Sequence, residues 1–327
     1  MNVYLYPSNT ETELQNIYIG ELYSWPLRFK AEEANSTIQL NKTGSPTSVT
    51  LETSRDGKTW STYTFWTAIT LSNIWDKVFF RNTSTTTTAF SIDFENRYSF
   101  TMTWSIAWSW DVTTLVNKSW TDTLVGTECF RRLFYNCTSL TSSPELPAKS
   151  LTNSCYMQMF SLCTSLTTVP ELPATTLADM CYNSMFLWCT ALTSAPELPA
   201  STMANQCYYM MFRWCTALTT PPKLSSTALA SSCYREMFNW CTSLETLPKL
   251  PATTLAAYCY RFMFKNCSKI KLSTTQTWAY QTAYRIPTTW TWTDWGSACD
   301  NMFTSTGWTF TWTPSLNTTY YTSNNVV

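Results

Sequence analysis

Histidine is absent from this chain of 327 residues, and several other features are scarce. Without histidine the chain lacks the commonest general base and metal ligand. The formal charge is zero and no Lys/Arg cluster occurs, which argues against the broad basic surface of a nucleic-acid binder. No run of about 18 apolar residues is present, so the sequence predicts no membrane span.

The first twenty residues lack the basic and apolar segments of a signal peptide. We therefore expect release by cell lysis, as for virion proteins. Phosphate loops, nucleophile elbows and metal-ligand spacings are missing as well. The sequence thus predicts a non-enzymatic protein with no catalytic residue, no metal and no cofactor.

What the sequence does contain is a unit of 26 residues that recurs six times without insertion or deletion. Each unit has two cysteines eight residues apart, and Pro-x-Leu follows in the first five units. A fixed period of this length indicates stacked units that bury their apolar faces against one another. Free cysteine is commonly buried, and zinc sites need closer pairs, so we predict core ladders of free thiols. The ladder positions are Cys129, Cys137, Cys155, Cys163, Cys181, Cys189, Cys207, Cys215, Cys233, Cys241, Cys259 and Cys267.

Apolar residues within a unit recur every four positions, as at Cys181, Met185 and Cys189, which predicts a helix. The Pro-x-Leu segment predicts a short strand, because proline does not fit a helix interior. One strand and one helix per unit is the layout of leucine-rich repeats. Phrases such as "LPATTLADMCYNSMFLWCTALTSAPELPA" resemble the BspA-like leucine-rich repeats of bacterial surface, protist surface and phage-encoded proteins. The resemblance implies binding surfaces and no catalytic motif.

The chain divides into four predicted segments. Residues 1–22 form a short β attachment segment, whose two alternating runs resemble the opening segments of phage tail and fibre-associated proteins. Residues 23–110 contain seven short β-rich runs and predict a β-sandwich-like domain that covers one end of the repeats. Residues 111–272 predict an α/β leucine-rich-repeat solenoid of six units. Residues 273–327 predict a degenerate repeat, with Ala298 in the place of a first cysteine, and a C-terminal cap.

One repeat column on the predicted strand face changes from unit to unit and carries charge. A paired-carboxylate hydrolase needs two carboxyl groups that converge across a cleft, whereas a column along a ladder is an open surface. We therefore interpret the column as a candidate binding surface, with Arg213 and Arg235 on the predicted helix side as alternatives. The column is Glu145, Glu171, Glu197, Lys223 and Lys249.

Tryptophan is abundant where glycine is rare: the chain has 17 Trp and 6 Gly. The residue before the second cysteine is Trp188, Trp214 or Trp240 in three units and asparagine in two others, and the BspA-like family commonly has glycine there. One hypothesis is that many tryptophans correspond to UGA codons that specify glycine in the natural host. The alternative is an exposed aromatic surface that binds glycans or protein. Further tryptophans in turn-like settings are Trp66, Trp75, Trp104, Trp108, Trp110, Trp120, Trp290, Trp292 and Trp312.

Together these features favour a phage virion surface or fibre-associated protein. Its expected partner is a host cell-surface glycan or protein, or another virion protein, without nucleic acid or a membrane span, and a homo-oligomer is left open. Two alternatives are a BspA-like adhesin on a bacterial surface or outside the cell, and an intracellular scaffold for protein interactions.

Overall fold

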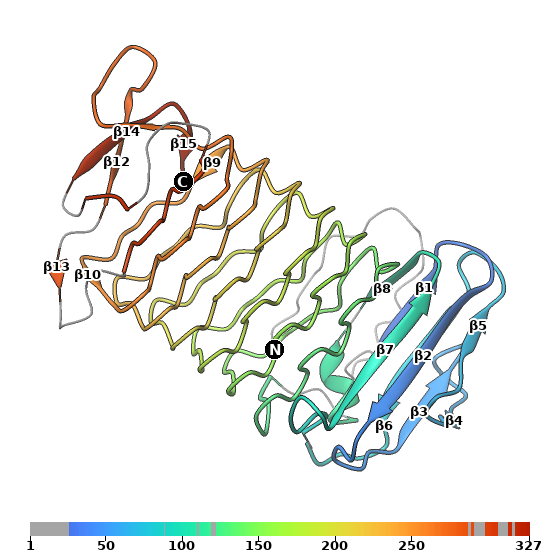
Figure 1. The fold of residues 1–327 in the computed structure, drawn as a ribbon. Coiled ribbons are helices and arrows are strands. Elements are labelled where there is room, and N and C mark those ends of the chain that lie inside the picture. Colours follow the sequence, from blue (N-terminus) through green and yellow to red (C-terminus); the bar gives the residue numbers. More distant parts are fainter. Residues whose placement is uncertain are drawn as a thin grey trace, which may run out of the picture.

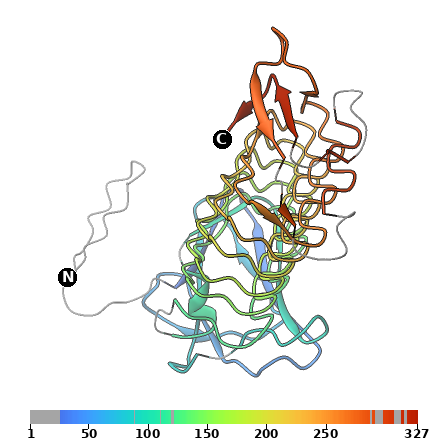
Figure 2. The same cartoon turned by 90° about the vertical axis from the view of Figure 1, so that its left-hand side faces the viewer.

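The computed structural model describes residues 26–87, 89–109, 111–118, 122–286, 289–290, 298–306, 313–315 and 318–327. A β domain (residues 26–109) leads into a stack of coils (residues 122–272, continued by 298–306), which we call the coil stack (Figure 1). The turned view in Figure 2 shows the coils following one another away from the β domain. The predicted attachment segment, residues 1–22, lies outside the described residues.

The β domain consists of two antiparallel sheets. Strands β3 (Leu51–Ser54), β4 (Ser61–Thr62), β6 (Lys77–Asn82), β1 (Leu27–Ala31) and β8 (Ile106–Ser109) form one sheet in the order β4-β3-β6-β1-β8. The other sheet has the order β5-β2-β7, with β5 (Ile69–Leu71), β2 (Ser36–Thr43) and β7 (Arg97–Thr103).

Aromatic side chains join the two sheets. Alternate residues of β1 and of the first half of β2 are buried, as expected for strands with one face toward a core. Phe100 of β7 lies 4.9 Å from the ring centroid of Phe29 on β1 and 5.4 Å from that of Phe80 on β6. Six of the seven β-rich runs contain strands β2 to β7, whereas the described residues of the run 89–94 form none.

Backbone hydrogen bonds hold the coils together in a regular alternation. The N–H groups of Tyr156 and Phe160 donate to the carbonyls of Cys181 and Met185 in the next coil, at 3.0 Å each. Residues between them donate to the carbonyl three positions earlier, as Met159 does to Tyr156 at 3.2 Å. Each coil is therefore a run of tight turns whose outward N–H groups all bond to the following coil.

Left-handed residues recur every fourth position in this part of each coil. In the third coil they are Met180, Ser184 and Trp188, with φ of 58°, 55° and 66°. An α-helix requires φ near −63° at every residue, so one positive φ in four interrupts it. The predicted α/β leucine-rich-repeat solenoid is therefore wrong, because the part of the chain that the structure describes contains no α-helix. Its only helical element is the 3₁₀ helix η1 (Val112–Leu115).

The core of the coil stack is built from vertical ladders of identical side chains. Phe186 is fully buried and stacks between Phe160 and Phe212, with centroid distances of 5.6 Å to each. The cysteines are buried and free. The second cysteine of a unit donates its thiol to a carbonyl of the preceding coil, as Cys189 Sγ does to Phe160 O at 3.1 Å. The repeated apolar positions thus face one continuous core.

The β domain covers the first coil. The ring of Phe100 stacks on Phe134 at 5.3 Å, and the N–H of Phe100 donates to the carbonyl of Leu133 at 2.8 Å. The N–H of Ile106 in β8 donates to the carbonyl of Ser139 at 3.1 Å. Phe100 therefore donates to the first coil as Phe134 does to the second, and β8 adds a further donor.

At the other end, residues 298–306 stack on the sixth coil. The N–H of Tyr260 donates to Ala298 O at 2.8 Å, so Ala298 occupies the register of a first cysteine. Strand β15 (Asn325–Val326) pairs in parallel with β9 (Thr246–Leu247), and β14 (Thr319–Thr322) lies between β11 (Leu272–Ser273) and β12 (Thr282–Arg285). Strand β10 (Thr254–Leu255) pairs in parallel with β13 (Thr289–Trp290).

Candidate binding surface

The charged column (Glu145, Glu171, Glu197, Lys223 and Lys249) is exposed in all five coils. Pro170 and Leu172, on either side of Glu171, are both buried. In extended backbone successive side chains point to opposite faces, so the buried neighbours direct the charged residue outward. The three carboxylates lie toward the β domain and the two lysines toward the C-terminal end.

Backbone bonds between coils keep the column in register. Four residues before the column, Thr167 N donates to Thr141 O at 3.0 Å and Glu245 N donates to Thr219 O at 2.9 Å. Glu171 therefore lies beside Glu145. The pKa of Glu145 is raised above its usual range, first because its carboxyl is partly desolvated and second because Glu171 is near. The structure thus brings the predicted residues together on one ladder, and no convergence of two carboxyl groups across a cleft is formed by them.

The alternative candidates, Arg213 and Arg235, lie in the turn segments and are engaged with one carboxylate. Arg213 Nη1 lies 3.0 Å from Glu236 Oε2, and Arg235 Nε lies 3.7 Å from Glu236 Oε1. Glu236 is only 7% exposed. Both guanidinium groups lie against one buried carboxylate between neighbouring coils, which balances one of their two positive charges.

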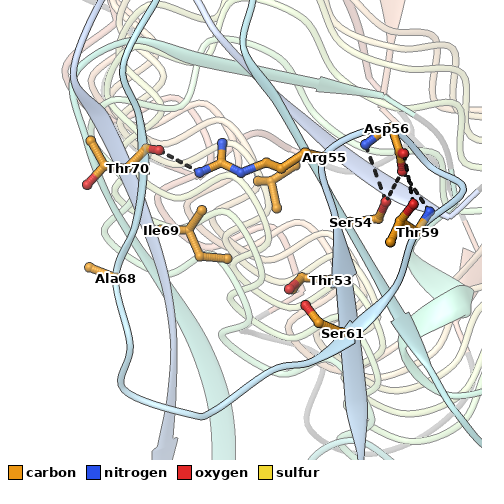
Figure 3. Close-up of a pocket in the computed structure, with 10 residues that line it drawn as sticks. Thr53, Ser54, Arg55, Asp56, Thr59, Ser61, Ala68, Ile69 and Thr70 are labelled. Carbon is orange, nitrogen blue, oxygen red and sulfur yellow. Dashed lines mark hydrogen bonds between the residues drawn. The ribbon is translucent and has the colours of Figure 1, made fainter.

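A shallow pocket of about 640 Å³ lies on the β domain (Figure 3). Arg55 crosses it and donates to the carbonyl of Thr70 at 2.7 Å. Asp56 stands at its edge, where Oδ1 accepts the N–H groups of Thr59 and Lys58 at 2.7 and 2.8 Å. These two hydrogen bonds, in that order, and the hydroxyl of Ser54 hold the pKa of Asp56 well below its usual range. The carboxylate therefore organises the turn and is unsuited to take up a proton near neutral pH.

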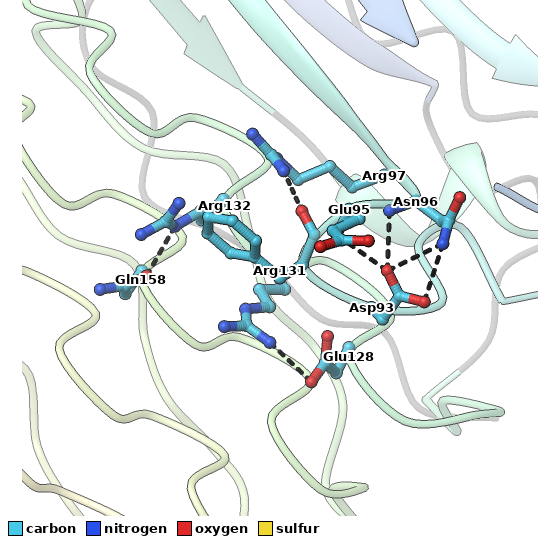
Figure 4. A network of polar contacts seen from close by, with 9 residues as sticks. Asp93, Glu95, Asn96, Arg97, Glu128, Arg131, Arg132 and Gln158 are labelled. Carbon is cyan, nitrogen blue, oxygen red and sulfur yellow. Dashed lines mark hydrogen bonds and ion pairs between the residues drawn. The ribbon is translucent and has the colours of Figure 1, made fainter. Parts of the chain in front are cut away.

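A polar network lies where the β domain meets the first coil (Figure 4). Three guanidinium groups surround the ring of Phe94, with Arg132, Arg97 and Arg131 at 4.3, 5.0 and 5.3 Å from its centroid. Arg131 pairs with Glu128 at 2.7 Å. The pKa of Arg97 is lowered by burial and then by Arg131. Sequence analysis did not single out this cluster, because its members come from different parts of the chain.

Asp111 carries a buried carboxyl group and lies beside Glu145, the first residue of the charged column. The sequence analysis did not identify it. Its backbone bridges to Glu145, and the residue is 4% exposed. Its carboxylate accepts the N–H and the hydroxyl of Thr113, each at 2.7 Å, and caps η1. Burial raises the pKa of Asp111 to about 7; the bonds from Thr113 oppose the rise and Glu145 adds to it. The sequence signal that could have pointed to Asp111 is the Asp-x-Thr pattern of residues 111–113, in which the aspartate can cap a following helix.

Metal and membrane features were searched over the same described residues. They contain no group of three or more Cys, Asp or Glu side chains placed to hold a metal ion. No helix among them has the length and apolar character needed to cross a bilayer. Comparison of the chain with protein-family models, with curated proteins and with solved structures gives no match.

Proposed function

We propose that this chain is a non-enzymatic recognition protein that contacts its partner through the charged column. The observation that carries the proposal is the column itself: five exposed side chains at one position of otherwise similar coils, held in register by backbone bonds. Residues that are buried for packing have little freedom to change, whereas an outward-facing residue between them can vary with the partner. Repeated structures use extended faces of this kind for binding.

The charge order of the column favours a partner of complementary order. Glu145, Glu171 and Glu197 precede Lys223 and Lys249, so the face is acidic at one end and basic at the other. Electrostatic complementarity of this type orients a partner and raises its association rate. The proposed setting is the surface or fibre of a phage virion, and the proposed partner is a glycan or protein on the host cell. The resemblance to BspA-like repeats supports a surface role.

The test is saturable binding of the purified protein to a panel of intact bacterial cells, with free surface polysaccharides and salt as competitors. The informative variant exchanges two column charges, Glu197→Lys with Lys223→Glu, and leaves the net charge unchanged. A matched control, Glu95→Lys with Lys58→Glu, exchanges two exposed charges on the β domain. We expect the column variant to weaken binding about tenfold or more and the control to bind as the parent does.

Two results would count against the proposal. Absence of saturable binding to any cell would remove the host-surface role. Equal weakening in both variants would mean that the column is not the contact surface. Competition by one polysaccharide would identify a glycan partner, whereas loss of binding after protease treatment of the cells would identify a protein.

A further inference from the structure

The backbone angles of the tryptophans distinguish two groups among them. Six tryptophans have positive φ, between 61° and 76°: Trp66, Trp75, Trp104, Trp188, Trp214 and Trp240. Left-handed backbone is disfavoured for any side chain with a Cβ, and a bulky residue there is an outlier. Every glycine that the structure describes, Gly44, Gly57 and Gly126, also has positive φ. Tryptophan thus shares the backbone conformation of glycine in this chain.

In the described part of the β domain, positive φ is confined to three residue types. In the described part of the β domain, the residues with positive φ are two glycines, Asn35, and Trp66, Trp75 and Trp104. Asparagine and glycine are the residues that tolerate this conformation at little cost. No phenylalanine or tyrosine of the described β domain adopts it, although phenylalanine is common there. Aromatic character therefore does not explain the positions of the three tryptophans.

The turns that hold Trp66 and Trp75 are of a type that favours glycine or asparagine. Thr67 N donates to Thr64 O at 3.2 Å, and Asp76 N donates to Asn73 O at 3.2 Å. Each bond closes a four-residue turn whose third residue is Trp66 or Trp75, with φ of 70° and 76°. A turn with positive φ at its third residue alone is type II, and glycine or asparagine is expected at that place.

The repeat column before the second cysteine shows the same geometry. Trp188, Trp214 and Trp240 are each the third residue of a turn that the following cysteine closes, as Cys189 N does on Phe186 O at 3.1 Å. The other three coils have Asn136, Leu162 and Asn266 at this place, also with positive φ. The two further left-handed columns of the coils contain no tryptophan, although other side chains with a Cβ, among them Tyr258 and Phe262, occupy them.

From these observations we infer that the natural protein carries glycine at Trp66, Trp75, Trp104, Trp188, Trp214 and Trp240. The corresponding codons are UGA, read as glycine by the ribosome of the natural host. Composition agrees with the inference, since glycine and tryptophan together make about 7% of the chain, the usual share of glycine alone.

Trp60 belongs to the other group and remains tryptophan. Its φ is not positive, it is half-buried, and the guanidinium carbon of Arg81 lies 3.8 Å from its ring centroid. A cation over an indole face is a contact that glycine cannot make. Lys30 Nζ also lies 4.3 Å from the ring centroid of Trp75, so the sign of φ, and not the cation contact, separates Trp60 from the other group. Trp66, Trp75 and Trp104 occupy three separate turns and are 59% to 61% exposed. Trp188, Trp214 and Trp240, by contrast, stack on one another with ring centroids 4.4 and 4.3 Å apart, so the inference at these three positions rests on their backbone angles.

The deciding experiment is tandem mass spectrometry of the protein isolated from its natural source. Trypsin cleavage after Lys58 and Lys77 releases one peptide that contains Trp60, Trp66 and Trp75, so the test and control positions are read from the same spectrum. We expect glycine at positions 66 and 75 and tryptophan at position 60. Tryptophan at all three positions would overturn the inference. Glycine at all three would refute the backbone criterion that separates Trp60 from the others.

A second measurement tests the backbone premise in recombinant protein. Trp66→Gly and Trp66→Ala lose the same indole contacts and differ in the tolerance of positive φ and in the disorder of the unfolded chain. We expect the glycine variant to have the higher midpoint of thermal unfolding, by roughly 2–4 °C. At Trp60 the order should reverse, with Trp60→Ala above Trp60→Gly, because glycine adds only disorder to the unfolded chain there. The same order at both positions would contradict the premise.

Discussion

Replacement of Asp111 by asparagine should change how the stability of the protein depends on pH. Asp111 is 4% exposed, and burial is the largest cause that raises its pKa from 3.8 to about 7. The native state therefore keeps this group protonated between about pH 4 and 7, while the unfolded state releases the proton. Stability falls with rising pH wherever the native state binds more protons than the unfolded state.

The size of the effect follows from the shift. A difference of about 3 pKa units corresponds to about 4 kcal/mol of stability, present below about pH 4 and lost as the pH rises to 7. Glu145 is the charged neighbour that adds to the shift, and the hydroxyl and N–H of Thr113 oppose it. An asparagine retains one acceptor for Thr113 and has no proton to release. We expect the free energy of unfolding of Asp111→Asn, relative to the parent, to rise by up to that amount across this interval.

The assay is urea unfolding of parent and variant at half-unit steps between pH 4 and 7.5, followed by circular dichroism. Comparing the two proteins at each pH removes the contributions of all other titrating groups. Asp56→Asn is the control: hydrogen bonds hold the pKa of Asp56 well below its usual range, so this group stays ionised across the interval and the difference between variant and parent should stay constant. A difference between Asp111→Asn and the parent that stays constant from pH 4 to 7 would refute the reasoning.

Two further predictions concern the core of the coil stack. Phe186→Ala should reduce the free energy of unfolding by about 3–5 kcal/mol, because a fully buried ring is lost from the middle of its ladder. Denaturant titration of parent and variant measures this loss. A reduction below about 1 kcal/mol would contradict the packing. None of the thirteen cysteines should react with a maleimide at pH 8 in the native protein, because all are buried and burial raises the pKa of each thiol, to about 12 for Cys129. All thirteen should react in denaturant, and rapid labelling before unfolding would show that a ladder is open to solvent.

The repeat register could be predicted from the sequence, whereas the conformation of each unit could not. A constant period of 26 residues places equivalent side chains beside one another whatever the local backbone is. For that reason the charged column was assembled from the sequence in the order that the structure has. The helix was predicted from apolar residues at Cys181, Met185 and Cys189, a spacing of four.

The strict spacing of four was itself evidence against an α-helix. Residues four apart on an α-helix point in directions that differ by about 40°. Apolar residues spaced strictly by four therefore move gradually around the helix and do not stay on one face. A run of turns that repeats every four residues keeps the same positions on one side without drift. Positive φ at Met180, Ser184 and Trp188 produces such a run, and the identities of these three residues give no sign of it. Contacts such as Asp111 with Glu145 depend on how the β domain joins the first coil, which no local pattern specifies.

The constant pattern of hydrogen bonds between coils makes the units interchangeable. In the turn segments each coil offers N–H donors to its successor and carbonyl acceptors to its predecessor, and the successive bonds from Tyr156 to Cys181 and from Tyr182 to Cys207 are the same. Near the charged column the direction is reversed, as from Thr167 to Thr141, and it is reversed in the same way in later coils, as from Glu245 to Thr219. Recombination between two units can therefore remove or add one complete coil and leave matching edges behind. The β domain and the C-terminal strands need not change when the stack shortens or lengthens. Such exchanges would alter the reach of the molecule and the place where the charge of its face changes sign, without a new fold being needed.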